Sequence, residues 1–193
     1  MPLGQGQRHT VTVLFADCRG FTRLAQDYPP EEMVKALNRF FQTVTQILIS
    51  HDGCVDKLLG DGLMAVFGAP LVRPDHADMA VAAALEMQRA LTELFPPSSD
   101  RPSLQIGIAI HSGEALVGNI GSQYMKDFTA IGEMVNLAAH LQEQAGPGEI
   151  LLTEATVNML RTPPKGGDFR EVTIKGRAEP LKVRVLASRT KVR

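Results

Sequence analysis

The sequence predicts an α+β sandwich in which helices are layered on a mainly antiparallel sheet. Strand-like apolar runs come in pairs joined by turns, long segments with helical spacing lie between the pairs, and strands and helices do not alternate strictly. The chain has 193 residues, of which 44% are hydrophobic and 21% charged. That is the size of one globular domain able to bury a core without disulfides or structural metal.

Charge and cysteine content exclude several classes of function. Twenty Lys and Arg against 21 Asp and Glu give a net charge of -1, which offers no electrostatic reason to bind nucleic acid or an acidic membrane. Cys18 and Cys54 form no CxxC pair, so a reducing cytoplasm is expected rather than a disulfide framework. No apolar run reaches the ~20 residues that cross a bilayer, which predicts a soluble protein or an excised cytoplasmic domain without membrane insertion.

The N-terminal part of the chain predicts a strand, a long helix and a hairpin. Residues 10–16, TVTVLFA, predict a buried strand that ends at Asp17. Apolar residues at three- and four-residue steps predict an amphipathic helix from Glu31 to Ser50. The segment CVDKLLGDGLMAVFG predicts two strands joined at residues 60–62, because glycine adopts the positive φ angles of a tight turn.

The rest of the chain predicts five further strands and three helices. An Ala-rich helix is expected from about Asp75, whose carboxylate can cap it, to about Phe95. Two strands, 104–111 and 115–120, are expected around a turn at residues 112–114. The remaining expected elements are a helix over EMVNLAAHLQEQA, short strands at 149–152, 168–174 and 181–187, and a small helix from Glu154 to Leu160.

Two aspartates are candidates for metal binding. Asp17 in FADCRGFT and Asp61 in KLLGDGLMAVFG each stand at the end of an apolar strand beside glycine. If these strands are neighbours, the carboxylates converge, and Mg²⁺ needs few protein carboxylates because water and phosphate oxygens complete its shell. The alternative is structural: Asp17 caps a short helix, and Asp61 serves a turn.

The loop Cys18-Arg19-Gly20-Phe21-Thr22 is a candidate phosphate-binding segment. It runs from a strand into a helical turn, where backbone N–H groups can cradle phosphate oxygens. The GxxxxGK[ST] and strand-linked GxGxxG patterns are missing from the sequence, which disfavours P-loop and Rossmann sites.

Four blocks of sequence, in order, resemble the class III nucleotidyl cyclase catalytic domain of the adenylate/guanylate cyclase family, in its bacterial adenylyl cyclase form. They are VLFADCRGFTRL, VDKLLGDGLMAVFGAP, IGIAIHSGEALVGNIGS, and DFTAIGEMVNLAAHLQ followed by TIKGRAEPLKV. The resemblance covers about residues 11–186. It implies a catalytic domain at 10–188 between short tails at 1–9 and 189–193.

The resemblance implies a ferredoxin-like sandwich acting as a head-to-tail homodimer, with active sites built across the interface. ATP or GTP is converted there to the cyclic 3′,5′ monophosphate and pyrophosphate. Two Mg²⁺ or Mn²⁺ ions per site assist attack of the ribose 3′-hydroxyl on the α-phosphate. Sensor domains or regulatory partners outside this chain are also implied.

Residue by residue, Asp17 and Asp61 match the family's metal-binding aspartates, and the backbone carbonyl of Cys18 matches a further metal ligand. Asn136 matches the asparagine that orients the ribose. Lys175 falls near the lysine that contacts the terminal phosphates.

Lys57 and Thr129 match the base-recognition pair and favour ATP. An ammonium only donates, so Lys57 suits the acceptor N1 of adenine and not the N1–H of guanine. Thr129 can accept from the adenine amino group, but a hydroxyl also donates, which weakens the preference. The structural alternative is that Lys57 is a solvated strand lysine and Thr129 a plain β-branched strand residue.

His140 departs from the family pattern, which places an arginine four residues after the asparagine. Imidazole presents at most two N–H donors and is largely neutral at pH 7, and loss of such charge stabilisation costs on the order of 10²- to 10³-fold in rate. The sequence therefore predicts an ATP-specific adenylyl cyclase, slow if His140 supports catalysis poorly. The alternatives are a regulatory module that binds nucleotide and dimerises without turnover and, third, a guanylyl cyclase.

Overall fold

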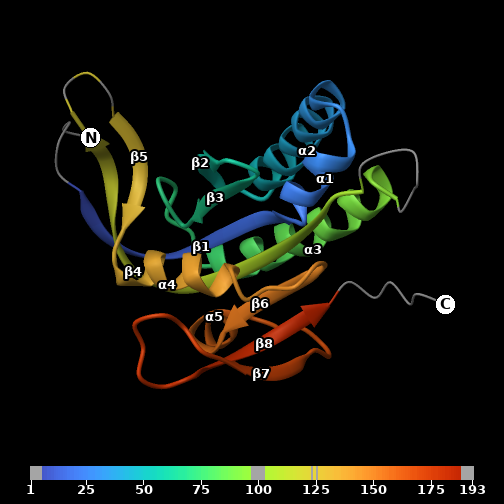
Figure 1. Cartoon of the computed structure of the whole chain (residues 1–193). Coiled ribbons are helices and arrows are strands. Elements are labelled where there is room, and N and C mark those ends of the chain that lie inside the picture. Colours follow the sequence, from blue (N-terminus) through green and yellow to red (C-terminus); the bar gives the residue numbers. More distant parts are fainter. Residues whose placement is uncertain (1–5, 97–102, 123, 125, 188–193) are drawn as a thin grey trace.

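The computed structural model describes residues 6–96, 103–122, 124 and 126–187. Within them, one eight-stranded sheet has the order β2-β3-β1-β4-β6-β8-β7, and β5 pairs with β4 (Figure 1). The strands are β1 (Gln7–Arg19), β2 (Cys54–Leu59), β3 (Gly62–Phe67), β4 (Gln105–Gly121), β5 (Lys126–Ile131), β6 (Glu149–Thr153), β7 (Asp168–Val172) and β8 (Leu181–Ala187). The helices are α1 (Phe21–Asp27), α2 (Pro30–Ser50), α3 (His76–Leu94), α4 (Glu133–Gln142) and α5 (Glu154–Met159).

The predicted α+β sandwich with a mainly antiparallel sheet is confirmed. All described strand pairs are antiparallel except β4–β6. β1 begins at Gln7, earlier than expected, because residues 7–9 continue its pairing with β4. Residues 1–5 and 188–193, which make up most of the two expected tails, lie outside the described residues.

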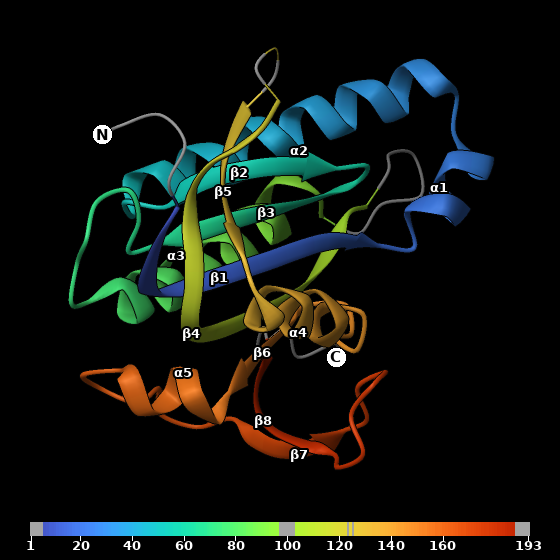
Figure 2. The same ribbon diagram turned by 90° about the vertical axis from the view of Figure 1, so that its left-hand side faces the viewer.

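Alternate side chains of β1 face opposite layers, as the two-residue period of a strand requires. Leu14 and Ala16 pack with apolar residues of α2 and α3, whereas Val13 and Phe15 pack with α4. Figure 2 shows α3 and α4 on opposite sides of β1. Both faces of β1 are therefore buried, which explains its nearly continuous apolar sequence.

The expected turn at residues 112–114 is wrong, because β4 runs without a break through it. Ser112 and Gly113 pair with β1, opposite Thr12 and Val11. A Cβ at Gly113 would lie 3.4 Å from Met134 Cβ, which is an ordinary van der Waals distance, so neither a turn nor a steric requirement explains this glycine. The hairpin instead joins β4 to β5, and the two strands extend together as an arm beyond the sheet (Figure 1).

The remaining elements agree with the expectations to within a few residues, with one difference at α3. Its N-cap residue Asp75 makes no side-chain capping hydrogen bond, because its carboxylate pairs with Arg73, with Arg73 Nε 2.9 Å from Asp75 Oδ1. Among the described helices, none combines the length and apolar character needed to cross a membrane.

Candidate active site

The structure brings Asp17 and Asp61 together. Asp17 lies on β1 opposite Gly62 of β3, and Asp61 occupies the β2–β3 turn. The Cys18 backbone N–H donates to the Asp61 carbonyl at 3.2 Å, which ties this turn to β1. Burial raises the pKa of the Asp17 carboxyl, and the negative charge of the adjacent Asp61 raises it further. Two carboxylates held this close repel each other unless a proton or a cation lies between them.

These donors fit Mg²⁺ or Mn²⁺. The Asp17 and Asp61 carboxyls lie within hydrogen-bonding reach of each other and supply the hard oxygen atoms that such ions prefer. Among the described residues, no group of three or more His, Cys, Asp or Glu side chains gathers into a larger metal cage. A pair of carboxylates leaves coordination positions for water and phosphate oxygens, as Mg²⁺ usually requires.

Arg19 reaches across the end of the sheet beside Asp17. Its Nη1 lies 3.5 Å from Asp17 Oδ2, and its Nη2 donates to the backbone carbonyl of Gln142 at the end of α4. A Cβ at Gly107 would lie 2.5 Å from Arg19 Nε, so glycine leaves room for the guanidinium. Arg19 therefore lowers the pKa of Asp17 against the effect of burial and connects β1 to α4.

A pocket of about 310 Å³ opens beside the Asp17 side chain. Its lining residues come from β1, the β2–β3 hairpin and α4, and are Phe15, Ala16, Asp17, Leu59, Gly62, Leu63, Ala139, Gln142 and Glu143.

The phosphate-loop candidate Cys18–Thr22 forms a left-handed turn before a short helix. Gly20 has φ 74°, a conformation that favours glycine, and its carbonyl accepts the Leu24 N–H at 3.1 Å inside α1. Cys18 is buried, and Phe21 packs partly against the core. The side chain of Thr22 lies outside the described residues.

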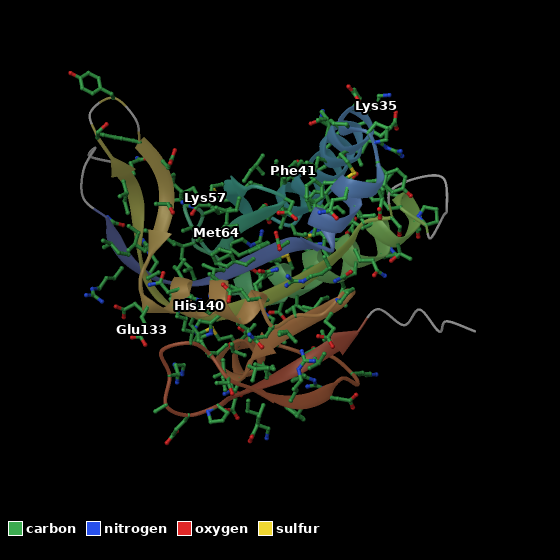
Figure 3. The ribbon with its side chains drawn as sticks, in the orientation of Figure 1. Lys35, Phe41, Lys57, Met64, Glu133 and His140 are labelled. Atoms are coloured by element: carbon green, nitrogen blue, oxygen red, sulfur yellow. The ribbon has the colours of Figure 1, made fainter. Side chains whose placement is uncertain are left out.

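Lys57 and Thr129 meet in a second cluster, between β2 and β5. Lys57 Nζ donates to Thr129 Oγ1 at 3.2 Å, and Figure 3 shows Lys57 on the side of β2 that faces the β4–β5 arm. The expectations omitted a third member, Asp56, whose carboxylate accepts the Thr129 hydroxyl and lies 2.9 Å from Lys57 Nζ. An acidic residue before Lys57 was visible in VDKLLGDG, but its contact with a residue 73 positions away was not.

In the part of the chain that the structure describes, no hydrogen bond or ion pair joins the remaining candidates to these clusters. Asn136 and His140 occupy successive turns of α4, where Asn136 is exposed and His140 Nδ1 lies 3.6 Å from Glu143 Oε1 (Figure 3). Lys175 is exposed between β7 and β8. Among the described residues, no hydrogen bond or ion pair joins the Asp17–Asp61 pair to the Lys57–Thr129 pair.

Comparison with known proteins identifies the family. Residues 4–186 match the sequence profile of the Adenylate and Guanylate cyclase catalytic domain. The uncharacterized protein Rv1318c of Mycobacterium tuberculosis is 35% identical over 195 residues, which cover 99% of this chain and 35% of that protein. The chain thus spans about a third of the length of the curated relatives it matches.

Two solved structures resemble the chain over nearly its whole length. The guanylyl cyclase Cya2 is 32% identical with a TM-score of 0.86, and the match covers 98% of each chain. The adenylyl cyclase CyaB from P. aeruginosa is 29% identical with a TM-score of 0.83, and the match covers 98% of this chain and 100% of that one. From the sequence match and the shared fold, the chain belongs to the adenylate/guanylate cyclase family and is a class III nucleotidyl cyclase catalytic domain.

Proposed function

We propose that this domain is an adenylyl cyclase that converts ATP to 3′,5′-cyclic AMP and pyrophosphate. Similarity to known cyclases does not choose the base, since the chain resembles an adenylyl and a guanylyl cyclase about equally. The observation that favours ATP is the contact between Lys57 and Thr129. An ammonium offers only N–H donors, and these suit the acceptor N1 of adenine and not the N1–H of guanine.

In the proposed reaction the ribose 3′-oxygen attacks the α-phosphorus, the bond from that phosphorus to the bridging oxygen breaks, and pyrophosphate leaves. Asp17, Asp61 and the Cys18 carbonyl would hold two divalent cations against the triphosphate. When bound, these ions promote loss of the 3′-hydroxyl proton and neutralise the departing charge. Backbone N–H groups of residues 19–22 would contact phosphate oxygens, since that of Cys18 already donates to the Asp61 carbonyl. No covalent bond to the protein forms.

The remaining roles fall to α4 and the β7–β8 segment. Asn136 would orient the ribose, His140 would donate an N–H to the α-phosphate, and Lys175 would contact the terminal phosphates. We propose that these groups meet the metal site of a second copy, in a head-to-tail homodimer with two shared sites. The two separate clusters within one chain support this arrangement. Both cysteines are free, which supports a cytoplasmic location. A role in cyclic-nucleotide signalling would follow from the proposed product.

A second candidate is a nucleotide-binding or dimerisation module without turnover, which the histidine at position 140 favours. A guanylyl cyclase comes third, and competition of GTP against ATP tests it.

The deciding experiment incubates purified protein with ATP and Mn²⁺ or Mg²⁺ and identifies the product by mass spectrometry. Cyclic AMP and pyrophosphate in equal amounts are expected, together with their loss in Asp61→Asn. Asp52→Asn serves as matched control, because Asp52 pairs with Arg73 outside the site. If no cyclic nucleotide forms at any pH, metal or protein concentration tested, the enzyme proposal fails.

A further inference from the structure

We infer that Asp56 determines base specificity by fixing the hydrogen-bonding direction of Thr129 and the position of Lys57. This inference rests on the proposed function and deepens it, because it concerns how the same site distinguishes adenine from guanine. Asp56 is a positioning residue in this role: it acts on the base through its two neighbours.

The local backbone explains why Asp56 and Lys57 reach the same neighbour. In a regular strand, successive side chains point to opposite faces. The pairing of β2 with β3 shifts register between Val55 and Lys57, and such a bulge re-aims the side chains around it. Asp56 and Lys57, although adjacent in sequence, therefore both contact Thr129 Oγ1 on β5.

Asp56 restricts the Thr129 hydroxyl to the role of hydrogen-bond acceptor toward a bound base. A hydroxyl has one hydrogen to donate and two lone pairs that accept. An ionised carboxylate only accepts, so the Thr129 hydrogen is directed to Asp56 Oδ2. One lone pair receives Lys57 Nζ at 3.2 Å, and the other remains. Thr129 is then an acceptor toward any further partner, which removes the ambiguity that the residue type alone carries.

The same carboxylate positions the ammonium group. Asp56 Oδ1 lies 2.9 Å from Lys57 Nζ and forms an ion pair with it. The Asp56 side chain is fully buried, whereas the Lys57 side chain is 38% exposed. Attraction to a buried charge is poorly screened by solvent, so it holds Lys57 beside Thr129 with N–H groups still free to donate.

In the resulting cluster, Lys57 presents only hydrogen-bond donors, and the neighbouring Thr129 presents only an acceptor. Adenine has the complementary pair, an acceptor N1 and a donor 6-amino group, whereas guanine has a donor N1–H and an acceptor O6. Without Asp56, the Thr129 hydroxyl could turn and donate to O6. Asp56 therefore penalises guanine, because a mismatched base leaves polar groups unpaired.

The test compares Asp56→Asn with the wild-type homodimer. The amide is nearly isosteric, carries no charge and can donate to Thr129, which frees the hydroxyl hydrogen. We expect the ratio of kcat/KM for ATP to that for GTP to fall at least about tenfold. The ratio for ATP to purine riboside triphosphate, which lacks the 6-amino group, should fall similarly. Non-cyclising 3′-deoxy-ATP and 3′-deoxy-GTP give the same comparison as binding constants, independent of turnover.

Three variants serve as controls. Asp52→Asn removes a carboxylate that pairs with Arg73 elsewhere, so its base preference should equal that of wild type. Thr129→Val should lower the ATP preference by itself. Adding Asp56→Asn to it should lower the ratio less than Asp56→Asn does in the wild type, because only the effect through Lys57 remains. Asp56→Glu, which keeps the charge, should retain more of the preference than Asp56→Asn. Thermal melts establish that each variant is folded.

The outcomes distinguish a failure of this inference from a failure of the proposed function. A wild type that prefers ATP, with Asp56→Asn preferring it equally, overturns this inference and leaves the proposed function standing. Additive effects of Asp56→Asn and Thr129→Val on the ratio also overturn it. A wild type that neither binds nor converts either nucleotide overturns the proposed function and this inference together. If Asp56→Asn does not fold, the Thr129→Val and Asp56→Glu arms decide: an unchanged preference in Thr129→Val overturns the inference, and a loss supports it.

Discussion

Asp17 on β1 and Gly62 on β3 lie so close that a Cβ at position 62 would be 2.7 Å from Asp17 Oδ1 and 2.6 Å from the Ala16 carbonyl oxygen. Because Gly62 has no side chain, the Asp17 carboxylate can lie close to the β2–β3 turn. Asp61, the residue directly before Gly62, is therefore held near Asp17. A requirement for close approach, and not a special φ angle, explains the second glycine of the Gly-Asp-Gly turn.

Gly62→Ala should lower cyclase activity at least about tenfold and destabilise the fold, because the added carbon meets backbone on the neighbouring strand. Gly60→Ala is the matched control. Gly60 lies at φ 66°, and a Cβ added there would meet nothing within 4 Å, so the substitution should cost stability through strain while leaving the carboxylates in place. The comparison uses activity per folded protein and thermal melts, and equal specific activity of the two variants would contradict the explanation.

Mixed dimers should recover activity that neither inactive parent has. Asp61→Asn removes one part of a shared site and Asn136→Ala the other, so each mixed dimer keeps one intact site. Co-expression with two affinity tags followed by tandem purification isolates the mixed dimers. Because one of their two sites is intact, the assay should give roughly half of wild-type activity per dimer. Recovery no greater than that of the parents would argue against sites built from two chains.

His140→Arg should raise turnover on the order of 10- to 10³-fold if the rest of the site is intact, because a guanidinium stabilises charge on the α-phosphate better than imidazole. His140 is 40% exposed and lies 3.6 Å from Glu143 Oε1, so a longer side chain has room and an acidic neighbour. His9→Arg adds the same charge at the start of β1 as a control. Unchanged turnover with measurable ATP binding would favour the nucleotide-binding module.

Stability should fall below neutral pH because of His111 on β4. Burial, with a contribution from the Arg177 charge, lowers the pKa of His111 from 6.5 to about 4. Above pH 6.5 the ring is neutral in both states. Between pH 6.5 and 4 the unfolded chain binds a proton that the folded chain does not, so the free energy of unfolding falls as pH falls, by about 3 kcal/mol in all.

Denaturant unfolding of wild type and His111→Gln at pH 7.5 and 4.5 measures this contribution. The variant lacks the titrating ring and should lose less stability between the two pH values, while His9→Gln should behave as wild type. Parallel pH dependence in all three proteins would assign the acid sensitivity to other groups. His76 is one such group, since burial also lowers its pKa.

Cys18 should resist thiol reagents in the folded protein. It is 4% exposed, and burial, followed by the negative charges of Asp61 and Asp17, raises its pKa well above the ordinary thiol value. Only the thiolate reacts, so iodoacetamide should label the less buried Cys54 at least about a hundred times faster. Peptide mass spectrometry with Cys54→Ser as control measures both rates. Comparable rates at the two sites would mean that the end of β1 opens readily.

Local pattern was sufficient for the elements whose neighbours in space are also neighbours in sequence. The β2–β3 hairpin needs only its two apolar runs and the Gly-Asp-Gly turn, and α2 needs only its apolar spacing. The convergence of Asp17 and Asp61 was predicted on the condition that their strands are neighbours, and the pairing of β1 with β3 meets that condition. Lys57 and Thr129 were predicted by motif as a pair, and the structure shows that they touch.

The tertiary structure decided what depends on distant partners. Residues 112–114 carry turn-forming types, but pairing with β1 keeps them in one long strand. Asp56 carried no signal of its own, because its role arises only where the β2 bulge and β5 bring it to Thr129. The sequence by itself therefore determined most of the elements, the candidate carboxylates and the family, but not the continuity of β4 or the strand β5. Packing between segments far apart in the chain determined the geometry of the cluster of Asp56, Lys57 and Thr129, since hydrogen-bond direction depends on every atom around a group and not on residue type alone.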